Sequence, residues 1–225
     1  MKALAIDTSL TRITIAAKND DNTAYVTLDI GMHQSEKLVP TIEYVLQTVG
    51  LETKDLDYSV LCKGPGSFTG LRLAFSALKA IEMAHNVPVY GVDTLECYSY
   101  AYKNMLEPVI CAVDAKKNRF YVRVSSNGQV CIEDGDFEIA DIKTKLEELG
   151  VDVFFVCGSD AKLFIERIKD EMKEVKFISL EGKPNETENL FTLAEEMIEK
   201  KIPALEDFEG PVYIRASEAE ENLNK

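Results

Sequence analysis

Short apolar runs separated by polar turns fill the first half of the chain, and their lengths are those of strands. Five runs predict a three-stranded meander and two further strands, over residues 2–7, 11–17, 24–30, 57–62 and 87–92. Apolar residues at helical spacing predict two helices among them. The first begins at Ser35, a suitable N-cap, and ends at Val49 before Gly50, and the second runs from Leu71 to His85. The first half therefore has the pattern of an α/β unit.

The second half of the chain repeats this order in a diverged form. Strands and helices alternate again, over residues 109–113, 119–124, 139–150, 151–156 and 161–172. In each half an Asp and an Arg five positions apart bracket the first hairpin connection, Asp7 with Arg12 and Asp114 with Arg119. We interpret the pattern as an internal duplication, with a first domain over residues 1–104 and a smaller second domain over residues 105–225. The alternative is the ordinary alternation of elements in any α/β chain.

Two further elements are predicted near the end of the chain. A last amphipathic helix covers about residues 188–200 and can return to pack on the first domain. A short strand follows over residues 212–214.

Composition and charge narrow the class of protein. The 225 residues suit one large domain or two small ones, and 46% hydrophobic content with 12 Gly and 7 Pro excludes collagenous and disordered classes. The 39 acidic and 25 basic residues leave a net charge of −14. Such a balance argues against a protein that binds nucleic acid with its average surface. Nucleic acid would be reached through a local patch or through a partner.

The N-terminal residues and the cysteines indicate the compartment. The first apolar stretch reaches Asp7 and is too short for a signal-peptide core or a membrane span, so a cytoplasmic protein with no membrane contact is expected. Five widely spaced cysteines predict buried, reduced thiols: Cys62, Cys97, Cys111, Cys131 and Cys157. Two histidines and no Cys-x-x-Cys supply no ligand set for a local zinc site, so no metal site is expected.

A glycine-rich loop joins the fourth predicted strand to the second helix. Backbone N–H groups at such a place form an anion site, and glycines let a ligand or another backbone come close. The loop lacks the Lys-Ser or Lys-Thr pair of a phosphate-binding P-loop. It is therefore either functional or structural, and its residues are Gly64, Pro65, Gly66, Ser67, Phe68, Thr69 and Gly70, followed by Arg72, which faces an anion or caps the helix surface.

The second helix has two apolar faces. A bulky face that includes Leu71, Phe75, Leu78 and Ile81 suits the sheet of its own domain. A smooth face of small side chains lets another helix approach closely. We predict that it forms a partner interface together with the first helix, through Leu73, Ala77, Ala80, Ala84, Tyr44 and Val45. The alternative places the smooth face against the first helix within one monomer.

Several charged residues are candidates for chemistry. Asp7 and Asp114 end strands, where a pair of carboxylates could share a metal ion or orient water, although such residues more often form turns or caps. His33 is a candidate base or an ordinary loop residue. The basic residues concentrate in one hairpin, which is either a docking patch or a solvated turn: Lys116, Lys117, Arg119 and Arg123.

Several sequence motifs resemble those of the bacterial TsaB family, also called YeaZ. The most specific motif is the segment from Lys63 to Arg72, KGPGSFTGLR. The similarity extends over nearly the whole chain, through LAIDTS at residues 4–9, HQSE at 33–36, GVDTL at 91–95, DAK at 114–116 and PVYIR at 211–215. At residues 118–121 the sequence reads NRFY, whereas the motif of the family more usually ends there in Glu-Val-Tyr.

The resemblance implies a fold and a role. The fold is a two-domain duplication of the actin, sugar-kinase and Hsp70 type, with ribonuclease H-like domains. The role is that of a non-catalytic partner subunit, which TsaD needs to transfer threonylcarbamoyl to the adenosine next to the anticodon of tRNA. The chain alone would be a homodimer without catalytic residues or cofactors of its own. TsaD and the ATPase TsaE would carry the metal and the ATP or ADP, and tRNA would be contacted indirectly.

Two enzyme interpretations compete with this role. A self-sufficient ATP-binding, kinase-like enzyme would use Asp7, Asp114 and the glycine loop. A peptidase of the glycoprotease type would need a nucleophile with its base or a metal triad, and the sequence contains no such set.

Overall fold

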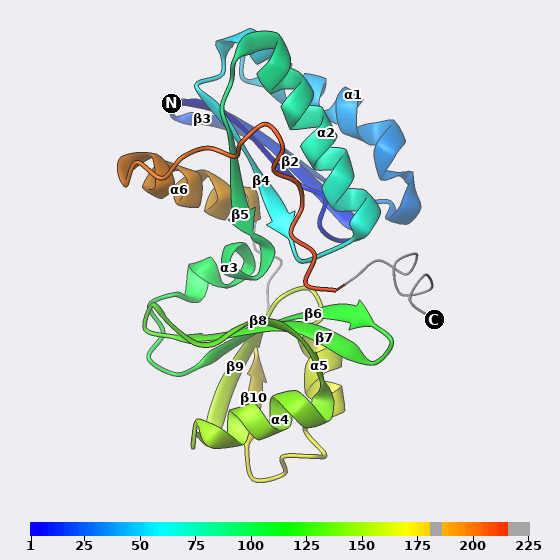
Figure 1. Cartoon of the computed structure of the whole chain (residues 1–225), viewed down its shortest axis with the longest axis vertical. Helices are drawn as coiled ribbons and strands as arrows, with labels where there is room; N and C mark the ends of the chain where they lie inside the picture. Colours follow the sequence, from blue (N-terminus) through cyan, green and yellow to red (C-terminus); the bar gives the residue numbers. More distant parts are fainter. Residues whose placement is uncertain (181–185, 216–225) are drawn as a thin grey trace. The chain divides into compact units, whose positions relative to one another are not determined.

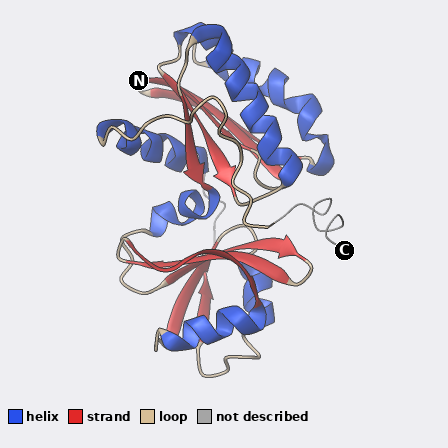
Figure 2. Ribbon diagram, in the orientation of Figure 1, coloured by secondary structure: helices blue, strands red, loops and turns tan. Residues whose placement is uncertain are grey.

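The computed structural model describes residues 1–180 and 186–215. This part of the chain divides into two compact units, both drawn in Figures 1 and 2. The first unit holds residues 1–97 and 186–213, and the second holds residues 98–180 with 214 and 215. The units change over between Cys97 and Tyr98, within helix α3 (Thr94–Ser99). The domain boundary near residue 104 stays a prediction.

A five-stranded mixed sheet forms the centre of the first unit, in the order β3-β2-β1-β4-β5. The first three strands are the predicted antiparallel meander, and the last two run parallel to β1. Their bounds are β1 (Lys2–Asp7), β2 (Arg12–Asn19), β3 (Asn22–Asp29), β4 (Tyr58–Gly64) and β5 (Val89–Asp93). Figure 1 shows two helices on one face of this sheet and one on the other: α1 (Gln34–Thr48) and α2 (Phe68–His85), then α6 (Glu186–Glu199).

Alternation of side chains along β1 explains how both faces of this sheet are covered. Leu4 and Ile6 join the apolar core formed with α1 and α2, whereas Ala3 and Ala5 point to the opposite face. All four side chains are completely buried. α6 contacts β1, β4 and β5 on that opposite face, where the alanines leave room for it. Helix α6, near the end of the described residues, therefore packs on the sheet to which the N-terminal strand β1 belongs.

The second unit has the same connectivity as the first. Its sheet order is β10-β9-β6-β7-β8, so a meander of three strands is again extended in parallel from its first strand. This repetition confirms the internal duplication. The elements are β6 (Val109–Lys116), β7 (Arg119–Ser126), β8 (Gln129–Glu138), α4 (Ile139–Glu148), β9 (Val153–Cys157), α5 (Ala161–Ile168) and β10 (Lys176–Ser179).

Aromatic side chains fill the core of the second unit. Phe120 of β7 and Phe164 of α5 meet edge to face, with ring centroids 5.3 Å apart, and Phe154 of β9 is completely buried. Helix α5 is thereby held against β6 and β9. This packing sets the position of the α5 residues that follow Phe164 relative to the β6–β7 hairpin.

The elements that the apolar pattern did not predict are β8, β10 and α3. β8 and β10 are the edge strands of the second sheet, and Ile132 of β8 is the only buried residue in the two, so their sequences show no apolar alternation. The predicted strand over residues 212–214 does not form. Val212 donates one backbone hydrogen bond to the Lys63 carbonyl (2.7 Å), and the preceding Pro211 has no N–H to continue a ladder.

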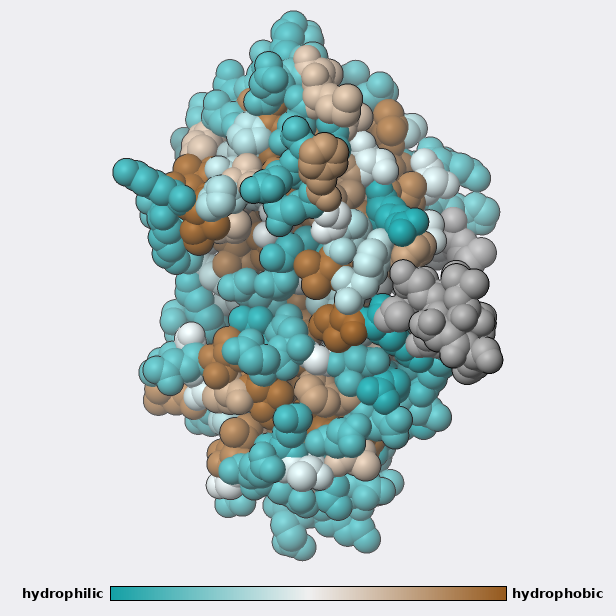
Figure 3. Space-filling model, in the orientation of Figure 1, coloured by the Kyte–Doolittle hydropathy of each residue, from teal (hydrophilic) through white to brown (hydrophobic). Residues whose placement is uncertain are grey.

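The cysteines follow the prediction except at one position. Cys62, Cys97, Cys111 and Cys157 are buried, whereas Cys131 is exposed on the edge strand β8. Polar residues cover most of the face drawn in Figure 3, and apolar residues show there in separate small areas. No helix in the described part of the chain is long and apolar enough to cross a membrane.

Candidate functional site: the glycine loop and the α1–α2 helix pair

The glycine loop connects β4 to α2 and is shorter than its sequence suggested. α2 begins at Phe68, not at Leu71, because the Ser67 hydroxyl accepts a hydrogen bond from the Gly70 N–H (3.2 Å) and caps the helix. The Ser67 N–H donates to the Ser9 carbonyl (2.6 Å), and the Leu71 N–H donates to the Ser67 carbonyl (2.9 Å). Three of the amides that could bind an anion are therefore used within the protein.

Gly66 and Gly70 are needed because another backbone lies against them. A β-carbon on Gly66 would collide with the Ser9 carbonyl oxygen, and one on Gly70 would collide with the Thr8 carbonyl oxygen. The Thr8 hydroxyl donates to the Gly70 carbonyl (2.7 Å) and fixes the approach. The glycines thus bring the β1–β2 connection against the start of α2, which favours the structural interpretation of the loop.

Gln34 completes this junction, although the sequence pattern drew attention to its neighbour His33. The Gln34 side-chain amide donates to the carbonyls of Leu10 and Thr11 (2.6 and 2.9 Å). His33 is largely exposed and lies 3.8 Å from Glu36. The buried polar role within HQSE therefore belongs to Gln34. Its partners lie more than twenty positions away in sequence, so no local pattern could have identified them.

Arg72 is engaged by aromatic rings. Its guanidinium lies 3.8 Å from the centroid of the Phe68 ring, and its Nε donates to the Tyr213 hydroxyl (3.0 Å). The Phe68 and Tyr213 rings are themselves 5.2 Å apart, and both are about two-fifths exposed. The arrangement is a surface cluster that ties the C-terminal segment to α2.

The bulky face of α2 packs on its own sheet. Leu71, Phe75 and Leu78 are buried in the core of the first unit, and Ile81 is partly buried beside it. The smooth face divides along its length. Leu73 and Ala77 are partly buried against that core, whereas Ala80 and Ala84 are exposed.

The predicted contribution of α1 to an interface needs one correction. Tyr44 is 61% exposed, but Val45 is completely buried, because it lies on the face of α1 that packs on the sheet with Leu38 and Ile42. A partner cannot reach Val45 directly. α1 and α2 contact each other and also expose larger apolar side chains, namely Val39 and Tyr44 on α1 and Met83 on α2.

Asp7 is a buried turn residue. Its carboxylate accepts hydrogen bonds from the Ser9 N–H (2.9 Å) and the Ser9 hydroxyl (2.6 Å). Arg12, which follows Asp7 by five positions, forms an ion pair with Glu186 of α6. Burial, followed by the Asp7 charge, raises the pKa of Glu186 to about 6, against the opposing effect of Arg12. Glu186 was missed because 174 positions separate it from Arg12.

Three of the four basic residues of the second hairpin are paired with acidic side chains. Asp114 accepts hydrogen bonds from the Lys116 N–H and the Lys116 ammonium (both 2.8 Å). Acidic side chains of β8 pair with both arginines. Arg119 pairs with Asp136 and Glu138, and Arg123 pairs with Asp134. These acids come from the edge strand that the apolar pattern did not predict. Among the described residues, no three His, Cys, Asp or Glu side chains are grouped to hold a metal ion.

Comparison with known proteins identifies relatives of this chain, one of which matches nearly its whole length. The model of the family "TsaD: tRNA N6-adenosine threonylcarbamoyltransferase" matches residues 30–221. A Bacillus subtilis protein named tRNA threonylcarbamoyladenosine biosynthesis protein TsaB is 27% identical over 98% of this chain and 96% of its own length. An Escherichia coli protein of the same name is 30% identical over 54% of this chain and 53% of its own length.

Solved structures share the fold. A Pseudomonas aeruginosa protein described as similar to peptidase YEAZ has a TM-score of 0.79 at 21% identity, and covers 95% of this chain and 99% of its own. A Bacteroides thetaiotaomicron protein described as having an actin-like ATPase fold has a TM-score of 0.50 at 13% identity, with 85% and 95% covered. Both likenesses agree with a two-domain α/β fold, and the second is to a protein described as actin-like.

Proposed function

Because the chain belongs to the TsaD family and is a TsaB/YeaZ-type member of it, we propose that it acts in the biosynthesis of threonylcarbamoyladenosine in tRNA. We assign it the role of a non-catalytic partner subunit of TsaD. The observation that carries the proposal is the near full-length match to a relative named for this pathway. The kinase-like and peptidase interpretations are not favoured, since the curated relatives are named for tRNA modification.

The contacts of the motif residues favour a structural role for these residues over a catalytic one. Gly66, Gly70 and Gln34 all hold the β1–β2 connection in place, and Asp7 stabilises its turn. These residues, which carry much of the resemblance, are thus committed to the fold of the first unit. The chemistry would then be supplied by partners, with the metal and the ATP or ADP on TsaD and TsaE.

The exposed side of the α1–α2 pair is the proposed docking surface for TsaD. Ala80 and Ala84 allow close approach of a second helix, and Tyr44 and Met83 provide larger apolar contacts beside them. Leu73 and Ala77 lie at the edge of this surface, closer to the core. Without TsaD the same surface would join two copies of the chain. TsaE would join the complex in the cytoplasm, and tRNA would be bound indirectly.

A reconstituted modification reaction tests this role with a pair of matched variants. Ala80→Glu places a charge on the proposed docking surface, whereas Ala140→Glu makes the same change at an exposed position of α4 in the second unit. With threonylcarbamoyl adenylate supplied as the donor, we expect TsaD and TsaE to form threonylcarbamoyladenosine in tRNA only when the chain is added. Ala80→Glu should lose at least about tenfold of that stimulation, because a desolvated, unpaired charge weakens association by several kcal/mol.

The control fixes how the result is interpreted. Ala140→Glu should support the reaction as the unchanged chain does. Modification by the chain without TsaD, or full stimulation by Ala80→Glu, would contradict the proposed role and surface respectively.

A further inference from the structure

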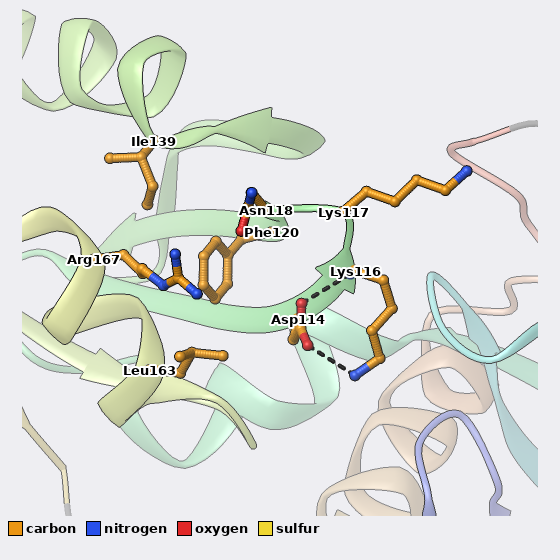
Figure 4. A pocket seen from close by; sticks show the side chains of 8 residues that line it. All are labelled: Asp114, Lys116, Lys117, Asn118, Phe120, Ile139, Leu163 and Arg167. Carbon is orange, nitrogen blue, oxygen red and sulfur yellow. Dashed lines mark hydrogen bonds and ion pairs between the residues drawn. The ribbon is translucent and has the colours of Figure 1, made fainter.

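A small pocket lies in the second unit, between the β6–β7 turn and helix α5. Its volume is about 190 Å³, and its lining combines three apolar side chains with polar ones at the rim. Phe120 forms the floor and is almost completely buried, while Ile139 and Leu163 are partly buried at the sides. Figure 4 shows the Arg167 side chain reaching from α5 toward the Phe120 ring and Asn118.

Arg167 is the cation that faces this pocket. The Lys117 side chain extends away from it in Figure 4, and the Lys116 ammonium is paired with Asp114 at 2.8 Å. Within the described ranges of the chain, the Arg167 guanidinium makes no hydrogen bond or ion pair. The Asp114–Lys116 pair is neutral overall. The pocket therefore presents one guanidinium and one side-chain amide, that of Asn118, above an apolar floor.

The turn beside the pocket has an unusual backbone. Lys116, Lys117 and Asn118 all have positive φ angles, of 63°, 54° and 60°. Residues other than glycine rarely adopt positive φ angles, although Asn adopts them more readily than Lys does. Lys117 and Asn118 are the two residues between the paired ends of β6 and β7, and two-residue hairpin turns favour positive φ at both positions, so the hairpin itself accounts for this backbone. Here the turn places Asn118 at the rim of the pocket.

The corresponding connections of the two units have different neighbours. In the first unit, Gly66, Gly70 and Gln34 lie against the β1–β2 connection. In the second unit, the glycine that precedes α5 is Gly158, and its close neighbour is Ala112 in the middle of β6. Beyond Ala112, the Asp160 carboxylate at the start of α5 accepts a hydrogen bond from the Asp114 N–H (3.0 Å).

We propose that this pocket binds a small monocarboxylic acid with an aromatic or branched apolar body. The carboxylate would pair with the Arg167 guanidinium, whose planar geometry matches it, and the Asn118 amide would donate a further hydrogen bond. The body would lie on Phe120 between Ile139 and Leu163. A cavity of about 150 Å³ holds a benzene ring, so the volume suits one ring or branched chain. A phosphate dianion fits less well, because only one unpaired cation faces the space and Asp114 lies at its edge.

NMR titration of the whole chain with simple probes tests the proposal. Benzoate carries both the carboxylate and the body, benzyl alcohol lacks the charge, acetate lacks the body, and phenyl phosphate carries a dianion. We expect benzoate to shift the signals of Asn118, Ile139 and Leu163, and the other probes to bind at least about tenfold more weakly.

Variants of α5 separate the site from general charge effects. Arg167→Gln should weaken benzoate binding by about tenfold or more, Arg167→Lys should retain part of it, and the exposed control Lys169→Gln should leave it unchanged. Arg167 is exposed, so these variants are expected to fold normally. Unchanged binding in Arg167→Gln, shifts confined to other residues, equal binding of acetate, or tighter binding of phenyl phosphate would each overturn the proposal. None of these outcomes depends on the proposed role with TsaD.

Discussion

At the scale of single residues, the β1–β2 connection shows how glycines and one amide determine the geometry of a junction. Gly66 and Gly70 leave room for the carbonyls of Ser9 and Thr8, and the Gln34 amide donates to the carbonyls of Leu10 and Thr11. The carbonyls of four successive residues, from Thr8 to Thr11, thereby have a partner or a close neighbour. Such a junction has little tolerance for added atoms.

Replacement of Gly70 tests this intolerance. Gly70→Ala should lower the free energy of unfolding by about 2–4 kcal/mol, because its β-carbon would overlap the Thr8 carbonyl oxygen and the backbones would have to separate. Urea denaturation measures the change. Gly210→Ala is the control, since a β-carbon at Gly210 meets no atom within 4 Å, and it should change stability by less than about 0.5 kcal/mol. Equal effects of the two substitutions would contradict this account.

Glu186 makes a separate prediction about pH. Its pKa is raised to about 6 from an ordinary value of 4.5, mainly by burial. Between these values the native protein holds a proton that the unfolded chain has released. The free-energy contribution of Glu186 to stability therefore falls as the pH rises through this range. The fall amounts to about 2 kcal/mol, at roughly 1.4 kcal/mol for each unit of pKa difference.

Glu186→Gln removes this titration. The difference in free energy of unfolding between the variant and the unchanged chain should move in favour of the variant by about 2 kcal/mol between pH 4.5 and pH 7. Urea denaturation at several pH values measures this difference. A difference that stays constant over the range would show that burial does not raise the pKa of Glu186.

At the scale of elements, the start of α2 depends on a single hydroxyl. Ser67 caps the helix through Gly70, and its own backbone is bound to Ser9 and Leu71. Ser67→Ala should cost about 1 kcal/mol of stability, because the Gly70 N–H loses its acceptor. Ser67→Thr should recover most of the loss, and Ser76→Ala, at an exposed position within the same helix, should cause none. Thermal unfolding of the three variants would decide, and equal stability of the two alanine variants would contradict the capping role.

At the scale of the whole molecule, the two compact units use one topology for different surfaces. In the first unit, α1 and α2 cover one face of the sheet and expose Tyr44, Ala80 and Met83. In the second unit, the exposed residues of α4 and α5 are mainly charged, with Arg167 beside a pocket. Association is therefore expected through the first unit alone.

Sedimentation of the isolated chain tests that expectation. The unchanged chain should sediment as a dimer, and Ala80→Glu should sediment as a folded monomer, because the charge would be desolvated between two helices. Ala140→Glu should remain a dimer. A dimeric Ala80→Glu variant would place the contact elsewhere, even if the modification assay showed a loss.

The sequence by itself determined the fold class, the duplication and the glycine motif, because buried strands, helix faces and tight turns leave local patterns. Leu71, Phe75 and Leu78 face their own sheet as their spacing predicts. Only the tertiary structure decided which charges meet. Arg12 pairs with Glu186, and acidic residues of β8 pair with Arg119 and Arg123. Partners that lie far apart in sequence leave no local pattern, and β8 and β10 bury too few side chains to show an apolar alternation, so neither could be predicted from the sequence.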